Sequence, residues 1–378
     1  MLSKLIESYY TQPQTIVKKH IFVHLLNDFS GSPKVLSQVI RAVQNKGGSL
    51  ELYTSKSEAG FLSGITANHY QYFYKRSENK WMTLLTFISS QIILFLKLLK
   101  YHNQDVVIYV NTMLPFGAGL AGLIMRKQVV YHVHETYLNP PLLKRFLRLV
   151  IRLSAKKVIF VSNSVKSLEF FKGLEQEVIY NALPKEFEVE GSKQIHQWKV
   201  AEVFNVLMIS SLKSYKGIHE FVSLANSFKS NSKITFTLVL NANKDETENY
   251  FDESNLSTNI ELVTKQVNVI KYYQKSSLVL NLSKVDECVE TFGLTIVEAM
   301  AFGIPVIVPP VGGPTEIVTN GVEGYLISSF ETNSIAEKIK ALSSNKEEWI
   351  RLSKNALKRS RDFNEEVFNK KIIDLLYA

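Results

Sequence analysis

Two glutamates, Glu290 and Glu298, flank a glycine-containing turn in the segment 290–327, which reads ETFGLTIVEAMAFGIPVIVPPVGGPTEIVTNGVEGYLI. The spacing of its apolar residues predicts a helix that begins near Gly293, and the strand IPVIV follows this helix closely. Free N–H groups and the helix dipole attract anions to the start of a helix. A carboxylate nearby can accept hydrogen bonds from hydroxyl groups. We therefore expect a ligand that carries phosphates and hydroxyls together, which describes a nucleotide sugar.

The order of short motifs in this segment resembles a known family. The elements E-TFG-LTIVE, AMAFG-IPVI, GG-PTEIV and G-EGYLI are similar to the donor-site signature of the retaining GT-B glycosyltransferases with the E-x7-E motif (glycosyltransferase family 4, glycosyl transferases group 1). The resemblance implies an α/β fold with two Rossmann-like, doubly wound parallel-sheet domains that face each other across a cleft. It also implies retaining sugar transfer from a nucleotide sugar, with a UDP-sugar favoured and with no metal or other cofactor.

The resemblance assigns the donor site to residues around the two glutamates. It implies that Glu298 binds the ribose of the nucleotide, and that Glu290 contacts the donor sugar or supports the catalytic site. The alternative interpretation of Glu298 is a surface glutamate favoured near a helix start. Backbone N–H groups would hold the sugar and the diphosphate in the segment Phe292, Gly293, Leu294 and Thr295.

A lysine-containing loop, SSLKSYKGIHEF at residues 210–221, resembles the family's G-R-L-x-x-x-K-G loop. Lys216 matches the family's lysine, and a cation there would neutralise the diphosphate as the sugar departs. The family's arginine falls on Ser211, so Lys213 is either a substitute cation or part of a solvated turn. We assign Ser211, Lys213 and Lys216 to the donor site, and we expect Lys216, Glu290 and His134 to be catalytic.

The first half of the chain is expected to supply the acceptor side and one more donor contact. His134 ends the strand VVYHVH, and the resemblance places such a histidine in the cleft, where a neutral imidazole can hydrogen-bond a hydroxyl or a phosphate. His132 points the same way in a regular strand, and we interpret it as structural. After the first strand, Gly31 lets a donor phosphate approach the backbone. The expected acceptor contacts are Asp28, Ser30, Ser32 and His134.

The domain organisation follows from length and from alternating apolar patterns. A chain of 378 residues is too long for one ordinary core. Short β-branched runs separated by helical stretches occur in both halves, which predicts parallel sheets with helices on both faces. We expect an acceptor domain over 1–190 and a donor domain over 191–362, joined by a polar linker within 184–200. The resemblance implies that a final helix over 363–378 crosses back to the first domain.

Charge is spread unevenly along the chain. Residues 1–157 carry 20 Lys and Arg against 7 Asp and Glu, whereas residues 158–378 carry 24 against 28. A basic half indicates an anionic partner, and we expect residues 75–157 to meet an anionic membrane surface. Within them, the apolar segment 81–100 predicts a buried helix, and the alternatives are a helix lying on the membrane and a helix that spans it. The acceptor would be a saccharide or a polyprenyl-linked saccharide of cell-surface polysaccharide synthesis.

Several other functions lack support in the sequence. GAGLAG at 117–122 fits G-x-G-x-x-G but lacks the preceding strand and following acid of a dinucleotide site, so we predict a helix with small residues against the sheet. Neither a metal-binding cluster nor a nucleic-acid motif is evident. Residues 1–20 do not resemble a signal peptide, and we expect a cytoplasmic protein, peripheral on the inner membrane face. Two rivals remain: a nucleotide-sugar epimerase on this fold, and a non-catalytic sugar-nucleotide-binding subunit, which Ser211 favours.

Overall fold

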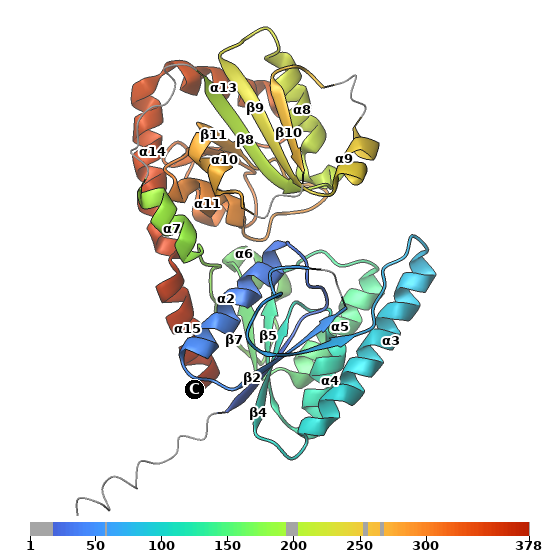
Figure 1. The fold of residues 1–378 in the computed structure, drawn as a ribbon. Coiled ribbons are helices and arrows are strands. Elements are labelled where there is room, and N and C mark those ends of the chain that lie inside the picture. Colours follow the sequence, from blue (N-terminus) through green and yellow to red (C-terminus); the bar gives the residue numbers. More distant parts are fainter. Residues whose placement is uncertain (1–17, 57–58, 194–202, 252–255, 265–267, 378) are drawn as a thin grey trace, which may run out of the picture.

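The computed structural model describes residues 18–56, 59–193, 203–251, 256–264 and 268–377. These residues form two α/β domains, one above the other, each built on a parallel sheet (Figure 1). The expected fold of two doubly wound parallel-sheet domains is confirmed. Residues 1–17, which hold most of the segment tested for a signal peptide, lie outside the described residues, as do residues 194–202 of the linker region.

The first domain holds a seven-stranded sheet in the order β3-β2-β1-β4-β5-β6-β7. Every strand pairs with its neighbours in parallel, and β4 is buried along its whole length. This burial on both faces explains the unbroken apolar runs in the sequence. The elements are β1 (Lys19–Val23), α2 (Gly31–Asn45), β2 (Leu50–Ser55), β3 (Asn68–Tyr72), α3 (Lys80–Leu98), β4 (Val106–Asn111), α4 (Phe116–Met125), β5 (Gln128–Val133), α5 (Pro141–Ser154), β6 (Lys157–Phe160), α6 (Asn163–Glu169) and β7 (Glu175–Val178).

The second domain repeats the plan with six parallel strands in the order β10-β9-β8-β11-β12-β13. The chain reverses its direction of winding between β8 and β11, as it does between β1 and β4. The elements are β8 (Phe204–Ser211), α8 (Ile218–Ser227), β9 (Ile234–Asn241), α9 (Lys244–Tyr250), β10 (Ile260–Thr264), α10 (Ile270–Lys275), β11 (Leu278–Leu280), α11 (Leu294–Ala301), β12 (Val306–Val308), α12 (Pro314–Ile317), β13 (Gly324–Leu326), α13 (Thr332–Ser344) and α14 (Lys346–Ser360).

Two elements have no counterpart in the sequence analysis. Strand β3 reads NHYQY and is mostly half-exposed at the edge of its sheet, so it lacks the apolar run that marks the inner strands. Helix α7 (Lys185–Ser192) lies within the segment expected to be an aperiodic linker. Phe187 packs edge-on against Tyr273 and Phe302, which fastens this helix to the second domain. The helix is short and acidic, and it has too few apolar residues to show a helical period in the sequence.

The GAGLAG segment forms helix α4, as expected. Gly119 and Gly122 lie against the sheet, where an added Cβ would meet the hydroxyl of Tyr131 and the side chain of Val129. Gly117 instead lies against α3, because an added Cβ there would come within 2.2 Å of the Gln91 carbonyl oxygen. The small residues therefore let α4 sit tightly between the sheet and its neighbouring helix.

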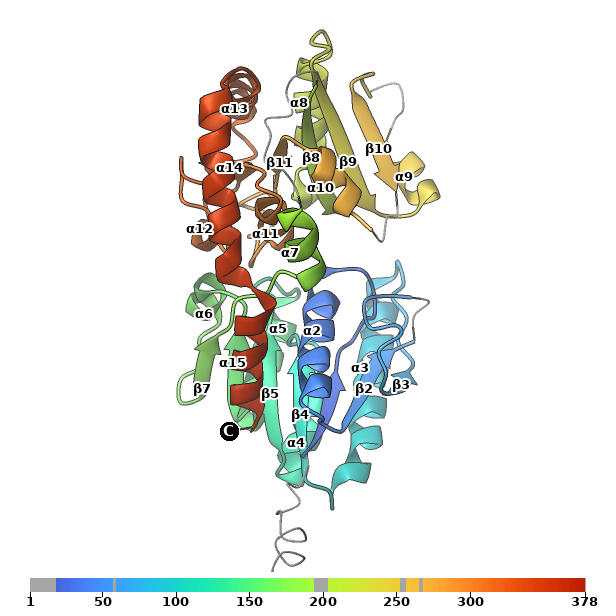
Figure 2. The same cartoon turned by 60° about the vertical axis from the view of Figure 1, so that its left-hand side comes forward.

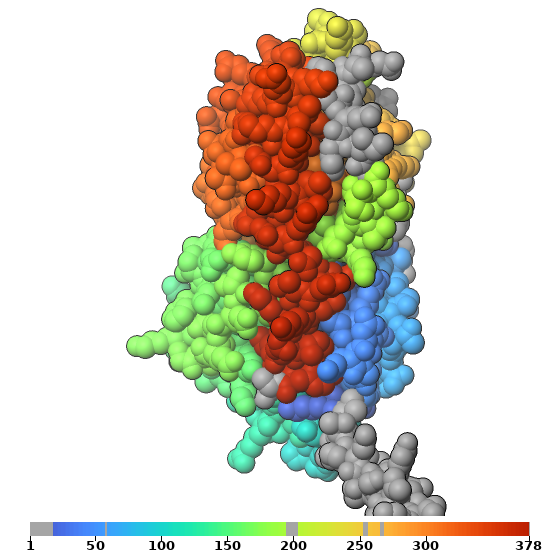
Figure 3. Space-filling model, turned by 90° about the vertical axis from the view of Figure 1, so that its left-hand side faces the viewer, coloured from blue at the N-terminus to red at the C-terminus, as the bar shows by residue number. Residues whose placement is uncertain are grey.

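Helices α14 and α15 (Glu365–Tyr377) run along one side of the molecule and span both domains, joined by a single 3-10 turn (Figures 2 and 3). The fully buried Ile372 on α15 packs with Phe22 and Val39 of the first domain, and α15 contacts α2. A parallel β-bridge between Leu183 and Asn364 ties the two interdomain crossings together. The C-terminal helix thus belongs to the core of the first domain.

Replacing Ile372 with alanine tests this docking. Truncation leaves a cavity in a packed core, so the free energy of unfolding should fall by about 2–5 kcal/mol. Urea denaturation followed by circular dichroism measures this, and Lys371→Ala on the exposed face of α15 is the matched control. A loss no larger than that of the control would show that α15 contributes little to the first domain.

Candidate functional site in the interdomain cleft

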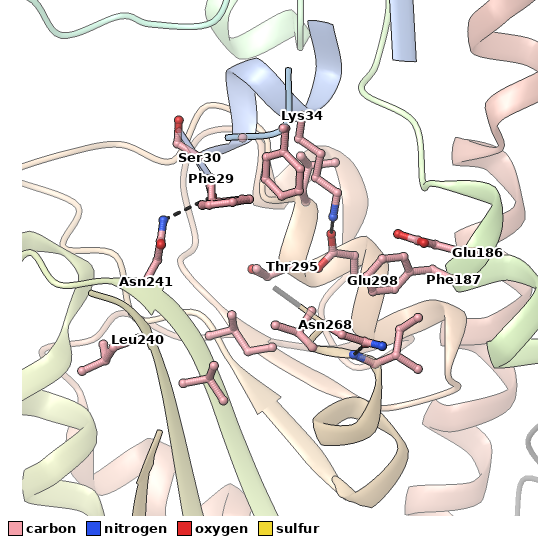
Figure 4. Close-up of a pocket in the computed structure, with 17 residues that line it drawn as sticks. Phe29, Ser30, Lys34, Glu186, Phe187, Leu240, Asn241, Asn268, Thr295 and Glu298 are labelled. Atoms are coloured by element: carbon pink, nitrogen blue, oxygen red, sulfur yellow. Dashed lines mark hydrogen bonds and ion pairs between the residues drawn. The ribbon is translucent and has the colours of Figure 1, made fainter. Parts of the chain in front are cut away.

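A pocket of about 340 Å³ lies between the two domains (Figure 4). The first domain contributes the turn into α2, and the second contributes the carboxyl ends of β8 and β9 and the start of α11. Apolar side chains line much of the pocket, and Glu298 and Lys34 bring opposite charges into it. Four of the residues that the sequence assigned to the donor site line this pocket: Gly31, Leu294, Thr295 and Glu298. Ser30, which the sequence assigned to the acceptor, also lines it.

Glu290 stands at the turn into α11 and forms an ion pair with Lys216, at 2.7 Å between Oε2 and Nζ. Ser283 donates a hydrogen bond to the same carboxylate oxygen at 3.2 Å. Burial raises the pKa of Glu290, but Lys216 and these hydrogen bonds outweigh it, so the pKa lies below its ordinary value. Burial lowers the pKa of Lys216, and Glu290 reverses this, which leaves the pKa raised. Both groups are therefore charged at neutral pH.

Glu298 is buried on α11 and is held by two partners. Lys34 of the first domain reaches its Oε1 at 2.5 Å, and the hydroxyl of Tyr273 donates to its Oε2 at 2.8 Å. The sequence analysis anticipated neither partner. Because Glu290 precedes α11 and Glu298 lies within it, the two acids and their lysines flank one helix start.

Helix α11 begins at a glycine for a structural reason. Gly293 is the N-cap residue, with φ at 105°, a conformation that side chains with a Cβ rarely adopt. The following N–H groups of Leu294 and Thr295 belong to the first turn, where helix geometry provides no carbonyl partner. Phe292 is different: its side chain is buried between the domains against Tyr180 and Phe363, so it supports the turn from the side away from the pocket.

The side chains of the loop after β8 point in different directions. Ser211 is the last residue of the strand, and its carbonyl oxygen accepts a hydrogen bond from the N–H of Lys213. The side chain of Lys213 is exposed, whereas Lys216 turns inward to Glu290. The structure thus brings one of the two loop lysines to the acids. Neither Ser211 nor Lys213 lines the pocket.

The turn into α2 is held by its own side chains. Asp28 accepts a hydrogen bond from the N–H of Ser30 at 2.9 Å and another from its hydroxyl. The carbonyl oxygen of Ser32 accepts from the Asn111 side chain at 3.1 Å. A Cβ added to Gly31 would meet only an ordinary contact, Leu294 Cδ1 of the other domain at 3.7 Å. Asp28 thus shapes this turn, and Asn111 ties the backbone of Ser32 to the end of β4.

His134 lies at the carboxyl end of the first sheet in a chain of hydrogen bonds. Its Nε2 pairs with Asn111 Oδ1 at 2.9 Å, and Asn111 Nδ2 donates to Ser32, which fixes the orientation of the amide. The Oδ1 can only accept, so Nε2 carries the proton and Nδ1 remains an acceptor. Burial, then His132 and His24, holds the pKa of His134 well below its usual range. A neutral imidazole of this kind is a hydrogen-bond partner and a poor base at neutral pH.

Thr112 and Glu135, next to His134, also escaped the sequence analysis. Thr112 follows β4 with φ at 72°, an unusual conformation for a β-branched residue. Glu135 fastens this turn, because its carboxylate accepts from the N–H of Met113 at 2.7 Å and of His134 at 3.1 Å. Strained backbone of this type often lies at functional sites. The sequence signal was weak: a polar pair, Asn111 and Thr112, at the end of a buried strand.

Comparisons with known proteins agree with this geometry. Residues 193–359 match the family model described as glycosyl transferases group 1. The capsular polysaccharide biosynthesis glycosyltransferase CapM of Staphylococcus aureus is 26% identical over 277 residues, which are 65% of this chain and 70% of that protein. Sucrose synthase of Denitrovibrio acetiphilus is 38% identical over 89 residues, or 22% of this chain, and the match spans only 11% of that protein.

Solved structures show the same architecture. The Anabaena protein HepE in complex with UDP and glucose superposes with a TM-score of 0.78 at 21% identity, over 96% of this chain and 100% of that one. A glycosyltransferase from Rickettsia africae gives a TM-score of 0.74 at 17% identity, over 96% and 98% of the chains. Two parallel-sheet domains with a cleft at the carboxyl ends of their strands define the GT-B fold. Residues 193–359 thus resemble the group 1 glycosyltransferases, and the whole chain has the GT-B fold.

The raised pKa of Glu135 should make the free energy of unfolding depend on pH. Burial raises the pKa of Glu135 to about 7, even though the two N–H groups favour the charged form. A folded-state pKa above the ordinary 4.5 means that the folded protein binds the proton more tightly, so this residue's contribution to stability falls as pH rises from about 4.5 to about 7. Urea denaturation of the wild type and of Glu135→Gln between pH 5 and 8 measures how the free energy of unfolding of each changes with pH. The stability advantage of the wild type should shrink as pH rises, and parallel curves would contradict the assignment.

Proposed function

We propose that this protein transfers a sugar from a UDP-sugar to a saccharide acceptor with retention of anomeric configuration. The observation that carries the proposal is the interdomain pocket, in which Glu298 and the start of α11 face the turn into α2. The second domain would hold the donor, and the first would present the acceptor near His134. HepE, which has the same fold, was solved with UDP and glucose and with UDP-glucose, and this supports the choice of nucleotide.

The donor would be held through its nucleotide and its diphosphate. Glu298 would accept hydrogen bonds from the ribose hydroxyls, while apolar residues such as Val269 and Ile270 line the pocket around it. The diphosphate would lie at the start of α11, where N–H groups of the first turn and the helix dipole favour negative charge. Lys216, held by Glu290, would supply a cation to the same region.

The reaction breaks the bond between the sugar's anomeric carbon and the diphosphate oxygen and forms one between that carbon and the acceptor oxygen. The acceptor's proton passes to a phosphate oxygen of the departing diphosphate, so the products are a nucleoside diphosphate and a glycoside. Lys216 and the α11 amides stabilise the charge that grows on the leaving group. Attack from the face that the diphosphate leaves retains the configuration. His134 is neutral and would orient a hydroxyl.

The proposal includes chemistry without a metal, carried by the lysine and backbone amides in the donor site. Among the described residues, no three His, Cys, Asp or Glu side chains are grouped to hold a metal ion. The similarity to CapM, a capsular polysaccharide biosynthesis glycosyltransferase, supports a role in cell-surface polysaccharide synthesis. Transfer to a polyprenyl-linked saccharide would then take place at the cytoplasmic face of the membrane.

Donor-site variants test the function. Lys216→Ala and Glu298→Ala should each lower UDP release from UDP-sugars, with a membrane lipid extract as the source of acceptor, by about 100-fold or more while circular dichroism stays unchanged. Exposed Lys229→Ala is the control, and EDTA should leave the wild-type rate unaltered. Near-normal rates in both variants would refute the site assignment. Sugar conversion without acceptor would indicate an epimerase, and UDP binding with no turnover on any acceptor would indicate a non-catalytic subunit.

The side of the first domain formed by α3, α4 and α5 supports the membrane part of the proposal. The helix Lys80–Tyr101 is long and apolar enough to cross a membrane by length and composition, and 28% of its apolar window is buried. Helix α3 packs against α4, and α4 against α5. The outer faces of α3 and α5 each expose a stripe of large apolar side chains at helical spacing: Trp81, Leu85, Ile88, Ile92 and Leu96, and Leu142, Phe146, Leu149 and Leu153. The buried-helix interpretation therefore holds for one face of α3 only.

Positive charge accompanies these stripes. Residues 75–157 contain 13 Lys and Arg against 3 Asp and Glu. Exposed basic side chains occur along α5, at Arg145 and Arg152, and at both ends of α3, at Lys80 and Lys97. Apolar stripes bordered by cations are typical of helices that lie in the interface of an anionic bilayer. We propose that this surface holds the acceptor domain on the membrane that carries its acceptor.

Vesicle sedimentation tests the membrane surface. The wild type should pellet with vesicles containing anionic lipid, less so at high salt, and hardly with vesicles of phosphatidylcholine alone. Replacing Trp81 and Leu85 with serine, or Arg145 and Arg152 with glutamate, should weaken binding about tenfold or more. Phe330→Ser, at an exposed aromatic residue of the second domain, is the matched control. Absence of binding at low salt would refute the membrane surface and leave the donor site untouched.

A further inference from the structure

One ion pair joins the two domains inside the donor pocket. Lys34 lies in the first turn of α2, and its ammonium reaches Glu298 on α11 across the cleft at 2.5 Å (Figure 4). The side chain of Lys34 is 15% exposed, and that of Glu298 is 5% exposed. The ammonium also lies 4.7 Å from the ring centre of Phe187 and 5.6 Å from that of Phe61. The pair is therefore largely shielded from water, where charges attract strongly.

The other hydrogen bonds between the domains that are described below are either uncharged or lie outside the pocket. On the pocket side, Asn241 donates a neutral hydrogen bond to the carbonyl oxygen of Phe29 at 3.2 Å. Elsewhere, Ser162 donates to the carbonyl oxygen of Thr291, and Glu316 accepts from the start of α6 and from a tyrosine hydroxyl. Neither of these groups lines the pocket. Lys34 and Glu298 thus form a charged contact that closes the cleft at the pocket itself.

We propose that Lys34 is a positioning residue that couples closure of the cleft to donor binding. Lys34 and Tyr273 each occupy one oxygen of Glu298, and a carboxylate has about four lone-pair sites. The remaining sites suit two neighbouring ribose hydroxyls, so the nucleotide binds a carboxylate that Lys34 has already neutralised and oriented. This part rests on the proposed function. Closure itself depends only on the pair.

Removing the Lys34 ammonium should destabilise the closed cleft, because the Glu298 carboxylate would lose its cation. A buried carboxylate without its cation carries a large desolvation cost, and opening the cleft would return Glu298 to water. The open cleft would also separate the turn into α2 from the start of α11, both of which line the pocket. The variant should therefore open without ligand, and it should bind nucleotide less tightly because binding must first close the cleft.

The ligand-free protein gives the first test. Spin labels at Lys56→Cys and Glu248→Cys, exposed positions in different domains, report the interdomain distance in a Cys288→Ala background. Lys34→Met should shift the distance distribution to longer values, and Lys34→Arg should restore it. Asn241→Ala should shift the distance distribution less, and Lys157→Met, at a lysine of similar burial at the start of β6, should not shift it. A distribution unchanged in Lys34→Met would overturn the proposal.

Nucleotide binding gives the second test. Calorimetry with UDP and UDP-glucose should show binding to Lys34→Met weakened about tenfold or more, while Lys34→Arg stays within about threefold of the wild type. In a Glu298→Gln background the same substitution should add little, because Lys34 acts through Glu298. Equal or tighter binding by Lys34→Met would show that Lys34 competes with the ribose, and it would overturn the proposal. A wild type that binds no nucleotide would count against the proposed function, and the ligand-free distances would still decide whether Lys34 holds the cleft shut.

Discussion

Parallel pairing of strands is the constraint on which the rest of the structure depends. Each sheet has all its carboxyl ends at one edge, and the winding of the chain reverses beside β1 and β8, which leaves room for a ligand at that edge. His24, Asn111 and His134 meet at the edge of the first sheet because they lie at the carboxyl ends of neighbouring strands. In the second sheet, Ser211 ends β8 and Ser283 lies just after the neighbouring β11. The two edges face each other, so side chains far apart in sequence share one cleft.

Ion pairs then determine the orientation of the acidic side chains in the cleft and beside it. Glu290, Glu298 and the fully buried Glu169 are each held by at least one lysine or arginine. Burying a carboxylate without a cationic partner costs free energy, so these lysines and the arginine hold the acids in place. An anionic nucleotide can approach two carboxylates only if cations neutralise them. The ion pairs at the cleft therefore have a structural role, and the proposed function gives them a second role in nucleotide binding.

Much of the fold could be predicted from the sequence because its inner strands are buried on both faces and read as unbroken apolar runs. Strand β3 and helix α7 could not, since an edge strand keeps polar residues and the short helix α7 buries only Phe187 and Gly191. The exposed stripes of α3 and α5 show a related limit. Apolar composition marks a surface that avoids water, but it does not say whether protein or another phase covers that surface.

The sequence by itself determined the two-domain parallel architecture, the helix start at Gly293 and the pair of acids around it, because periodicity, turn residues and motif spacing are local properties. Only the tertiary structure decided the partners of those acids. Lys34 lies 264 positions from Glu298, and no local pattern links them; they meet because α2 and α11 begin at facing sheet edges. Likewise, Lys216 turns inward while Lys213 stays exposed, although both belong to one short loop. Such choices depend on which charges and cavities the folded chain brings near, and these exist only after both domains have formed.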